Sequence, residues 1–106
     1  MLGAPSGAQP PANLSEEGNA ALNFVRQRVP EVANANLVSF TSQIVQGTNY
    51  GFTFEGYEGV IGVWAKSWEN NFLQITLPNG TLISNQWSSP IKFVIYLINT
   101  IFFYRK

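Results

Sequence analysis

The side chains that could carry out catalysis are few in this chain. It contains no cysteine and no histidine, which excludes a nucleophile with a histidine base and a zinc site built on thiolate or imidazole. Glu55 and Glu58 are close enough in sequence to suggest a general acid and base, but they flank a glycine-rich turn, where solvated charges are the norm. The glycines between Gly56 and Gly62 lack the spacing and the lysine of a phosphate-binding loop. We therefore expect a protein that is not an enzyme and that uses no metal and no cofactor.

Length and charge narrow the classes of function further. A chain of 106 residues suits one domain with a core of its own. Charged residues make up 11% of the chain and the formal net charge is zero, so we expect no nucleic-acid partner and no anionic membrane surface. Residues 1–7 lack the basic start and apolar run of a signal peptide. Together with the absence of cysteine, this predicts a leaderless cytoplasmic protein.

Residues 13–30 have the pattern of one helix. Asn13 or Ser15 can cap it, and the glutamates that follow suit the first turn of a helix. Apolar residues recur at helical spacing: Leu22, Val25 and Val29. Gly18 weakens the pattern slightly. Pro30 disfavours helical geometry at the residue before it, which predicts that the helix ends there.

From residue 37 the apolar period changes to two, which is typical of strands. In the first strand, Val38, Phe40 and Ile44 share one face. Turn residues at 46–49 separate it from a second alternating segment, and together they predict an antiparallel hairpin. Further strands are predicted at 60–66, 72–77 and 81–84, and the first of these is dense in apolar residues and so expected to be central. We predict the α+β class, with one N-terminal helix packed on a four- to five-stranded antiparallel sheet.

The two ends of the chain differ from the middle in composition. Residues 1–12 are small residues, proline and glutamine, which by composition alone predict a disordered tail. Residues 90–106 are strongly apolar and stand outside the predicted domain, 1–89. They are short for a membrane span, which needs about 20 residues. Three interpretations stay open: a further strand or helix packed on the domain, a tail anchor or interfacial segment, or an incorrectly predicted last exon.

The most informative segment is 43–50, Gln-Ile-Val-Gln-Gly-Thr-Asn-Tyr. Taken alone, it predicts a hairpin tip in which Gly47 has a positive φ. The segment resembles the Gln-x-Val-x-Gly motif of the cystatins, with Gln43, Val45 and Gly47 on the three fixed positions. Its Thr-Asn-Tyr continuation is similar to that of the stefins, the intracellular cystatins. The motif also follows one helix and one strand, near the middle of the chain.

Two further places carry the resemblance. Leu2 and Gly3 are similar to the N-terminal segment of the stefins, whose glycine near the terminus is an inhibitory element. Residues 63–68 are similar to a strand and second loop of plant cystatins, and Trp68 matches their tryptophan. Ser67 stands where a proline is common, so we expect this loop to order on binding. The simpler alternatives are tail flexibility for Gly3 and, for Trp68, a side chain folded onto its own sheet.

The resemblance implies a cystatin-like fold and a reversible, tight-binding inhibitor of papain-like cysteine proteases of the cathepsin type. It implies that an N-terminal trunk and two hairpin tips lie along one edge and enter the active-site cleft. The residues implied for protease contact are Leu2, Gly3, Gln43, Ile44, Val45, Gln46, Gly47, Ser67 and Trp68. A monomer is expected, with a domain-swapped dimer as the alternative. The second functional hypothesis is a cystatin-fold binding or assembly module without inhibition.

Overall fold

A computed structural model of the chain describes residues 6–86. Leu2, Gly3, the predicted domain boundary at 89 and the apolar segment 90–106 lie outside the described residues. Within the described part, no helix is long and apolar enough to span a membrane.

The predicted helix is confirmed as α1, Glu16–Arg28, which follows a 3₁₀ turn at Pro11–Asn13. Of the two candidate caps, Ser15 is the N-cap: its Oγ accepts a 3.0 Å hydrogen bond from the Gly18 amide. This bond satisfies one of the backbone N–H groups left free at a helix start. The helix ends at Arg28 because the next residue precedes a proline and is extended. A second 3₁₀ turn, Pro30–Val32, leads to the sheet.

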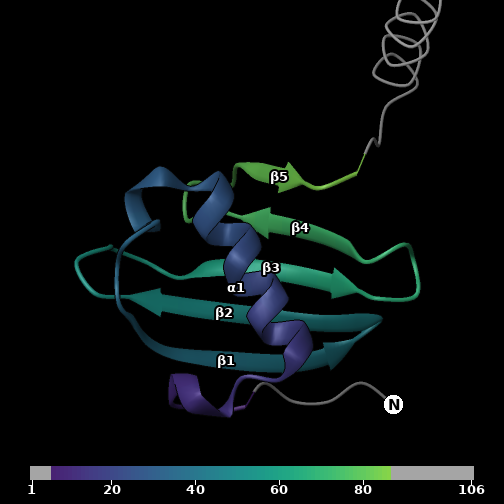
Figure 1. Cartoon of the computed structure of the whole chain (residues 1–106), viewed down its shortest axis with the longest axis horizontal. Helices are drawn as coiled ribbons and strands as arrows, with labels where there is room; N and C mark the ends of the chain where they lie inside the picture. The colour runs from purple at the N-terminus through teal and green to yellow at the C-terminus, as the bar shows by residue number, and fades with distance from the viewer. Residues whose placement is uncertain (1–5, 87–106) are drawn as a thin grey trace, which may run out of the picture.

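Five strands form one antiparallel meander in the order β1-β2-β3-β4-β5, and α1 crosses one of its faces (Figure 1). They are β1 (Leu37–Val45), β2 (Gly47–Phe54), β3 (Ile61–Lys66), β4 (Phe72–Thr76) and β5 (Leu82–Ser84). The α+β class and the central position of β3 are confirmed. β2 begins earlier than predicted because Val45 pairs directly with Gly47, so that Gln46 alone links the two strands. The predicted boundaries of the other strands agree with the structure to within one residue.

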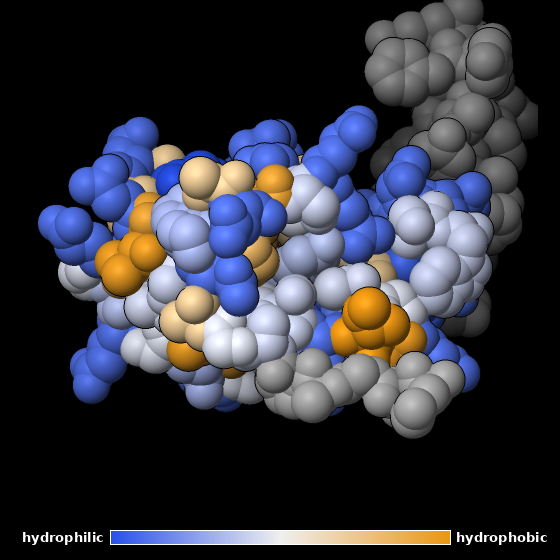
Figure 2. Space-filling model, turned by 90° about the horizontal axis from the view of Figure 1, so that it is seen from below, coloured by the Kyte–Doolittle hydropathy of each residue, from blue (hydrophilic) through white to orange (hydrophobic). Residues whose placement is uncertain are grey.

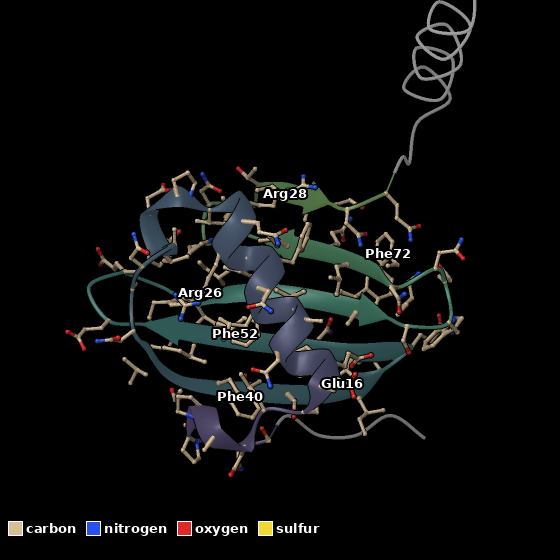
Figure 3. All side chains as sticks on the ribbon, viewed as in Figure 1. Glu16, Arg26, Arg28, Phe40, Phe52 and Phe72 are labelled. Carbon is tan, nitrogen blue, oxygen red and sulfur yellow. The ribbon has the colours of Figure 1, made fainter. Side chains whose placement is uncertain are left out.

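The core lies between α1 and the face of the sheet that it covers. Phe40 on β1 and Phe52 on β2 lie beside the helix in Figure 3, and both are buried. The rest of the buried apolar set comes from the helix, the turn after it and the strands: Ala21, Phe24, Val25, Val29, Val32, Tyr50, Phe54, Ile61, Val63, Ala65 and Ile75. Leu22, which we placed on the helical stripe, is only partly buried at the margin of this core.

Two side chains of the first strand do not join the core as its alternation predicts. Val38 is 53% exposed and Ile44 is 63% exposed. Val38 has no partner in β2 because the register shifts between Leu37 and Ser39. Ile44 lies at the hairpin end of β1, past the part of the sheet that α1 covers (Figure 1).

Arg26 fixes the C-terminal end of the helix to the chain that follows it. Its Nη1 donates hydrogen bonds to the carbonyl oxygens of Val32 (3.0 Å), Ala33 (3.3 Å) and Ala35 (2.7 Å). Its guanidinium also lies 5.5 Å from the centroid of the Phe54 ring. These contacts close the loop between α1 and β1.

The expected disorder of residues 1–12 is wrong for the described part, residues 6–12. Gln9 and Phe40 exchange two backbone hydrogen bonds of 2.8 and 3.0 Å, and the Ser6 amide donates to the Ser42 carbonyl at 2.8 Å. The Ser42 amide in turn donates to Ser6 Oγ at 2.9 Å. The segment thus runs antiparallel along the free edge of β1. Composition does not predict this pairing, because the segment is held by backbone hydrogen bonds to an edge strand and not by burial of apolar side chains.

Candidate functional site

The tips of the β1–β2 and β3–β4 hairpins lie at the same end of the sheet (Figure 1). An open groove joins them, lined by residues 44–48 of the first tip and 67–69 of the second. Glu17, in the first turn of α1, completes the lining. The start of the helix lies at this end too, as Glu16 shows in Figure 3. Segments far apart in sequence therefore form one continuous surface.

Gly47 is required at the first tip for two reasons. Its φ of +99° is confirmed as positive, a conformation that side chains other than glycine rarely adopt. A Cβ at this position would overlap the carbonyl oxygen of Ala65 and would lie 2.9 Å from Cγ of Lys66. The tip therefore packs its backbone directly on β3.

A cluster on the face of the sheet opposite α1 connects the two tips. The Trp64 indole Nε1 donates a 2.7 Å hydrogen bond to the carbonyl oxygen of Gln46 in the first tip. Lys66 Nζ lies 4.2 Å from the centroid of the Trp64 ring and 4.8 Å from that of Phe72. The same ammonium forms a 3.1 Å ion pair with Glu69 in the second tip. The sequence does not predict the hydrogen bond of Trp64. The alternation of β3 indicates on which face of the sheet Trp64 lies, but its contact with Gln46 depends on how β2 pairs with β3.

The second tip presents Trp68 to solvent. Its side chain is 63% exposed, so it is not folded onto the sheet. Ser67 and Gln46 are exposed, and Ile44 is as exposed as Trp68. The tips thus offer apolar surface without a covering element among the described residues. Figure 2, which views the β1 side of the molecule, shows hydrophobic colour only in small separate patches on a largely hydrophilic surface.

The residues of the Gln-x-Val-x-Gly segment occupy different environments. Val45 and Gly47 are half-buried, line the groove and pair with each other. Gln43 is half-buried, pairs with Asn49 further along the hairpin and is not part of the groove lining. The structure therefore brings Val45 and Gly47 to the groove and holds Gln43 within the sheet.

A hydrogen-bonded group beneath the first tip attaches it to the helix. The Tyr50 hydroxyl donates to Oε1 of Glu17 at 2.8 Å and lies 3.3 Å from Oγ of Ser15. The pKa of Tyr50 is raised above its ordinary value, chiefly by burial of the hydroxyl. The hydrogen bond to Ser15 opposes this increase, and the neighbouring carboxylate of Glu17 adds to it. Gly18 lies at a close approach: a Cβ added there would lie 3.2 Å from Tyr50 Cε1 and 2.6 Å from Cδ2 of the Leu14 side chain. The glycine that weakens the helical pattern thus allows the helix to approach the tyrosine.

The N-terminal segment reaches the same end of the molecule. Ser6 lies beside Ser42, two positions before Ile44 along β1. A second hollow is lined by Ser6, Ile44 and Thr48, among others, so it borders the first tip. Since the segment is antiparallel to β1, its residue numbers fall toward the tip.

Comparisons of the chain with protein-family models, with curated proteins and with solved structures find no match. Among residues 6–86, no three acidic, histidine or cysteine residues are grouped so as to hold a metal ion. The carboxylates at the groove are Glu17 and Glu69, and both already have partners, in Tyr50 and Lys66. What the arrangement offers is a contact surface of two hairpin tips and an adjoining edge segment.

Proposed function

We propose that this protein is a stefin-like member of the cystatin superfamily that inhibits papain-like cysteine proteases reversibly and tightly. The observation that carries the proposal is the groove that joins the 44–48 tip to the Trp68 turn. These are the two segments whose sequences resemble the inhibitory loops of that superfamily. The N-terminal segment adds support because it runs beside the same tip.

The physical basis is the match between projecting tips and a concave cleft. A protease cleft is blocked by a complementary surface that fills it, and no chemistry is required of the inhibitor. Ile44 and Trp68 supply exposed apolar area at the two tips, and aromatic residues of this kind commonly anchor interfaces. The first tip is held by the packing of Gly47 and by the Trp64 bond, so little order has to be gained there on binding.

In this proposal each contact residue occupies a different part of the protease cleft. Gln46 and Gly47 cover the catalytic centre mainly through their backbone, and Trp68 packs on the primed side. Leu2 enters an apolar subsite on the other side, and Gly3 lets the chain turn away from the nucleophile. No peptide bond is then presented for cleavage. A monomer and a cytoplasmic location belong to the same proposal, since a chain without cysteine suits a reducing compartment.

The experiment is a titration of papain activity on a small peptide substrate with the full chain. We expect activity to fall to zero near one inhibitor per enzyme, to recover on dilution, and the chain to remain uncut by mass spectrometry. A folded sample that leaves papain active at micromolar concentration would contradict the proposal. The second candidate, a binding or assembly module of the same fold, would then remain.

A further inference from the structure

The turn that carries Trp68 has an unusual backbone. Asn70 and Asn71 follow each other with φ values of 54° and 57°, the left-handed region. Residues other than glycine rarely adopt this region, and asparagine tolerates it best. The turn contains three backbone hydrogen bonds, from the Glu69 amide to the Lys66 carbonyl (3.1 Å), from Asn71 to Ser67 (3.2 Å) and from Phe72 to Glu69 (3.1 Å). The cost of two consecutive left-handed residues has to be offset by contacts that hold the turn.

Two consecutive amide side chains beyond β5 hold this turn from outside. Gln86 Nε2 donates to the carbonyl oxygens of Glu69 (2.9 Å) and Asn70 (2.8 Å). Asn85 Nδ2 donates to the Asn71 carbonyl at 2.9 Å, and its Oδ1 accepts from the Leu73 amide at 2.9 Å. We call these four bonds the amide clamp. Both partners of Gln86 are acceptors, so only its nitrogen end can make these bonds.

The clamp matters because Trp68 cannot hold its own position. Its side chain is 63% exposed, and no proline stiffens the preceding residue, which is Ser67. The direction in which Trp68 projects is therefore set by the backbone of the turn. That backbone is held by its own three hydrogen bonds, by the amide clamp and by the ion pair of Lys66 and Glu69. An ion pair at a surface contributes little by itself.

We propose that Asn85 and Gln86 are positioning residues that hold the 67–71 turn in the conformation that presents Trp68. Their consequence for protease binding rests on the proposed function. When only a fraction of the molecules has the competent turn, the apparent dissociation constant rises by the inverse of that fraction. The amide clamp keeps that fraction near one and makes ordering on binding, which we expected from Ser67, unnecessary.

The first part of the test measures the turn alone, in the full chain. Gln86→Met keeps the length of the side chain and removes its donors, whereas Gln86→Lys retains donors. Gln27→Met, at an exposed position of α1, is the matched control. Amide hydrogen exchange by NMR should become about tenfold faster at Phe72 and Leu73 in Gln86→Met only. Exchange at Val63 and Ile75 should be unchanged, which shows that the domain stays folded.

The second part measures binding to papain with and without Trp68. In the parent background, Gln86→Met should weaken the complex about tenfold, and Gln86→Lys and Gln27→Met should not. In a Trp68→Ala background, Gln86→Met should have less than about a twofold effect, because the two residues then act through one contact.

The possible results separate the two proposals. Unchanged exchange at Phe72 and Leu73 in Gln86→Met would overturn the amide clamp, whether or not the parent inhibits papain. An equal loss of affinity in both backgrounds would overturn its action through Trp68. A parent chain that does not bind papain would overturn the proposed function, while the exchange rates would still decide whether the clamp holds the turn.

Discussion

The indole Nε1 of Trp64 lies 2.7 Å from the backbone carbonyl oxygen of Gln46 and donates a hydrogen bond to it. Trp64 belongs to β3, whereas Gln46 is the single residue between β1 and β2. The Trp64 ring also meets the Phe72 ring edge-on, with centroids 5.8 Å apart, and carries Lys66 over its face. One tryptophan thus joins the first tip to the strands that carry the second.

Trp64→Phe tests this junction because it keeps an aromatic ring and removes the N–H donor. We expect a loss of about 1 kcal/mol in the free energy of unfolding and faster amide exchange at Thr48. Trp68→Phe is the control, since that side chain is exposed, and it should change neither quantity. Unchanged exchange at Thr48 in Trp64→Phe would show that the bond does not hold the tip.

Gly47→Ala should destabilise the protein more than the same change at another positive-φ glycine. Gly80 has a φ of +90°, and a Cβ added there would meet nothing within 4 Å, so Gly80→Ala measures backbone strain alone, about 1 kcal/mol. At Gly47 the overlap with Ala65 is added, so we expect a loss of about 2 to 3 kcal/mol or more. Urea unfolding of both variants gives the comparison, and equal losses would contradict the close packing of the tip on β3.

Trp68→Ala should separate affinity from stability. Truncating an aromatic side chain that anchors an interface typically costs about 2 kcal/mol, at least a tenfold weaker complex. Because the contact is apolar, most of the loss should appear in the dissociation rate. The melting temperature should change little, since the side chain is 63% exposed.

Leu82→Ala is the matched control for Trp68→Ala, because Leu82 is 59% exposed on β5. It should leave papain binding at the parental level. A Trp68→Ala variant that melts much earlier and binds papain as tightly as the parent would assign the tryptophan to the core.

Ionisation of Tyr50 should lower the free energy of unfolding at alkaline pH. The pKa of Tyr50 is raised in the folded state, chiefly because burial disfavours the phenolate, and its ordinary value is 10.0. The folded state therefore retains a proton that the unfolded state loses, and stability falls as the pH rises from about 10 through the folded pKa. Free energies of unfolding from pH 8 upward should show this fall in the parent and much less of it in Tyr50→Phe.

Tyr57→Phe, in the turn after β2, provides the comparison for Tyr50→Phe. It should keep the alkaline loss of the parent, because Tyr50 is intact. An identical fall in parent and Tyr50→Phe would mean that another group causes it.

Local patterns in the sequence predict the helix, the strands and the positive φ of Gly47 at the first tip. The helix follows from Ser15, from apolar spacing of about 3.6 and from Pro30, all of which act within a few residues. The positive φ at Gly47 follows from a glycine between two alternating strands. Each of these signals lies inside the element that it specifies.

The contacts that hold the tips were not predicted, because each joins residues that are distant in sequence. The Trp64–Gln46 bond spans 18 residues, and the Gln86–Asn70 bond spans 16. Ser6 and Ser42 are separated by 36 residues, and their pairing overrides a composition that indicates disorder. Strand register decides these contacts, and alternation gives the face of a side chain but not its neighbour on the next strand.

The most direct test of the central claim compares binding of the full chain to two forms of papain. One has a free active site, and the other carries a bulky peptidyl inhibitor covalently attached to its catalytic cysteine. Because the proposed contacts lie inside the cleft, we predict tight, reversible binding to the free enzyme and at least about a hundredfold weaker binding to the filled one. Equal binding to both forms, or no binding to either by a folded sample, would contradict the account.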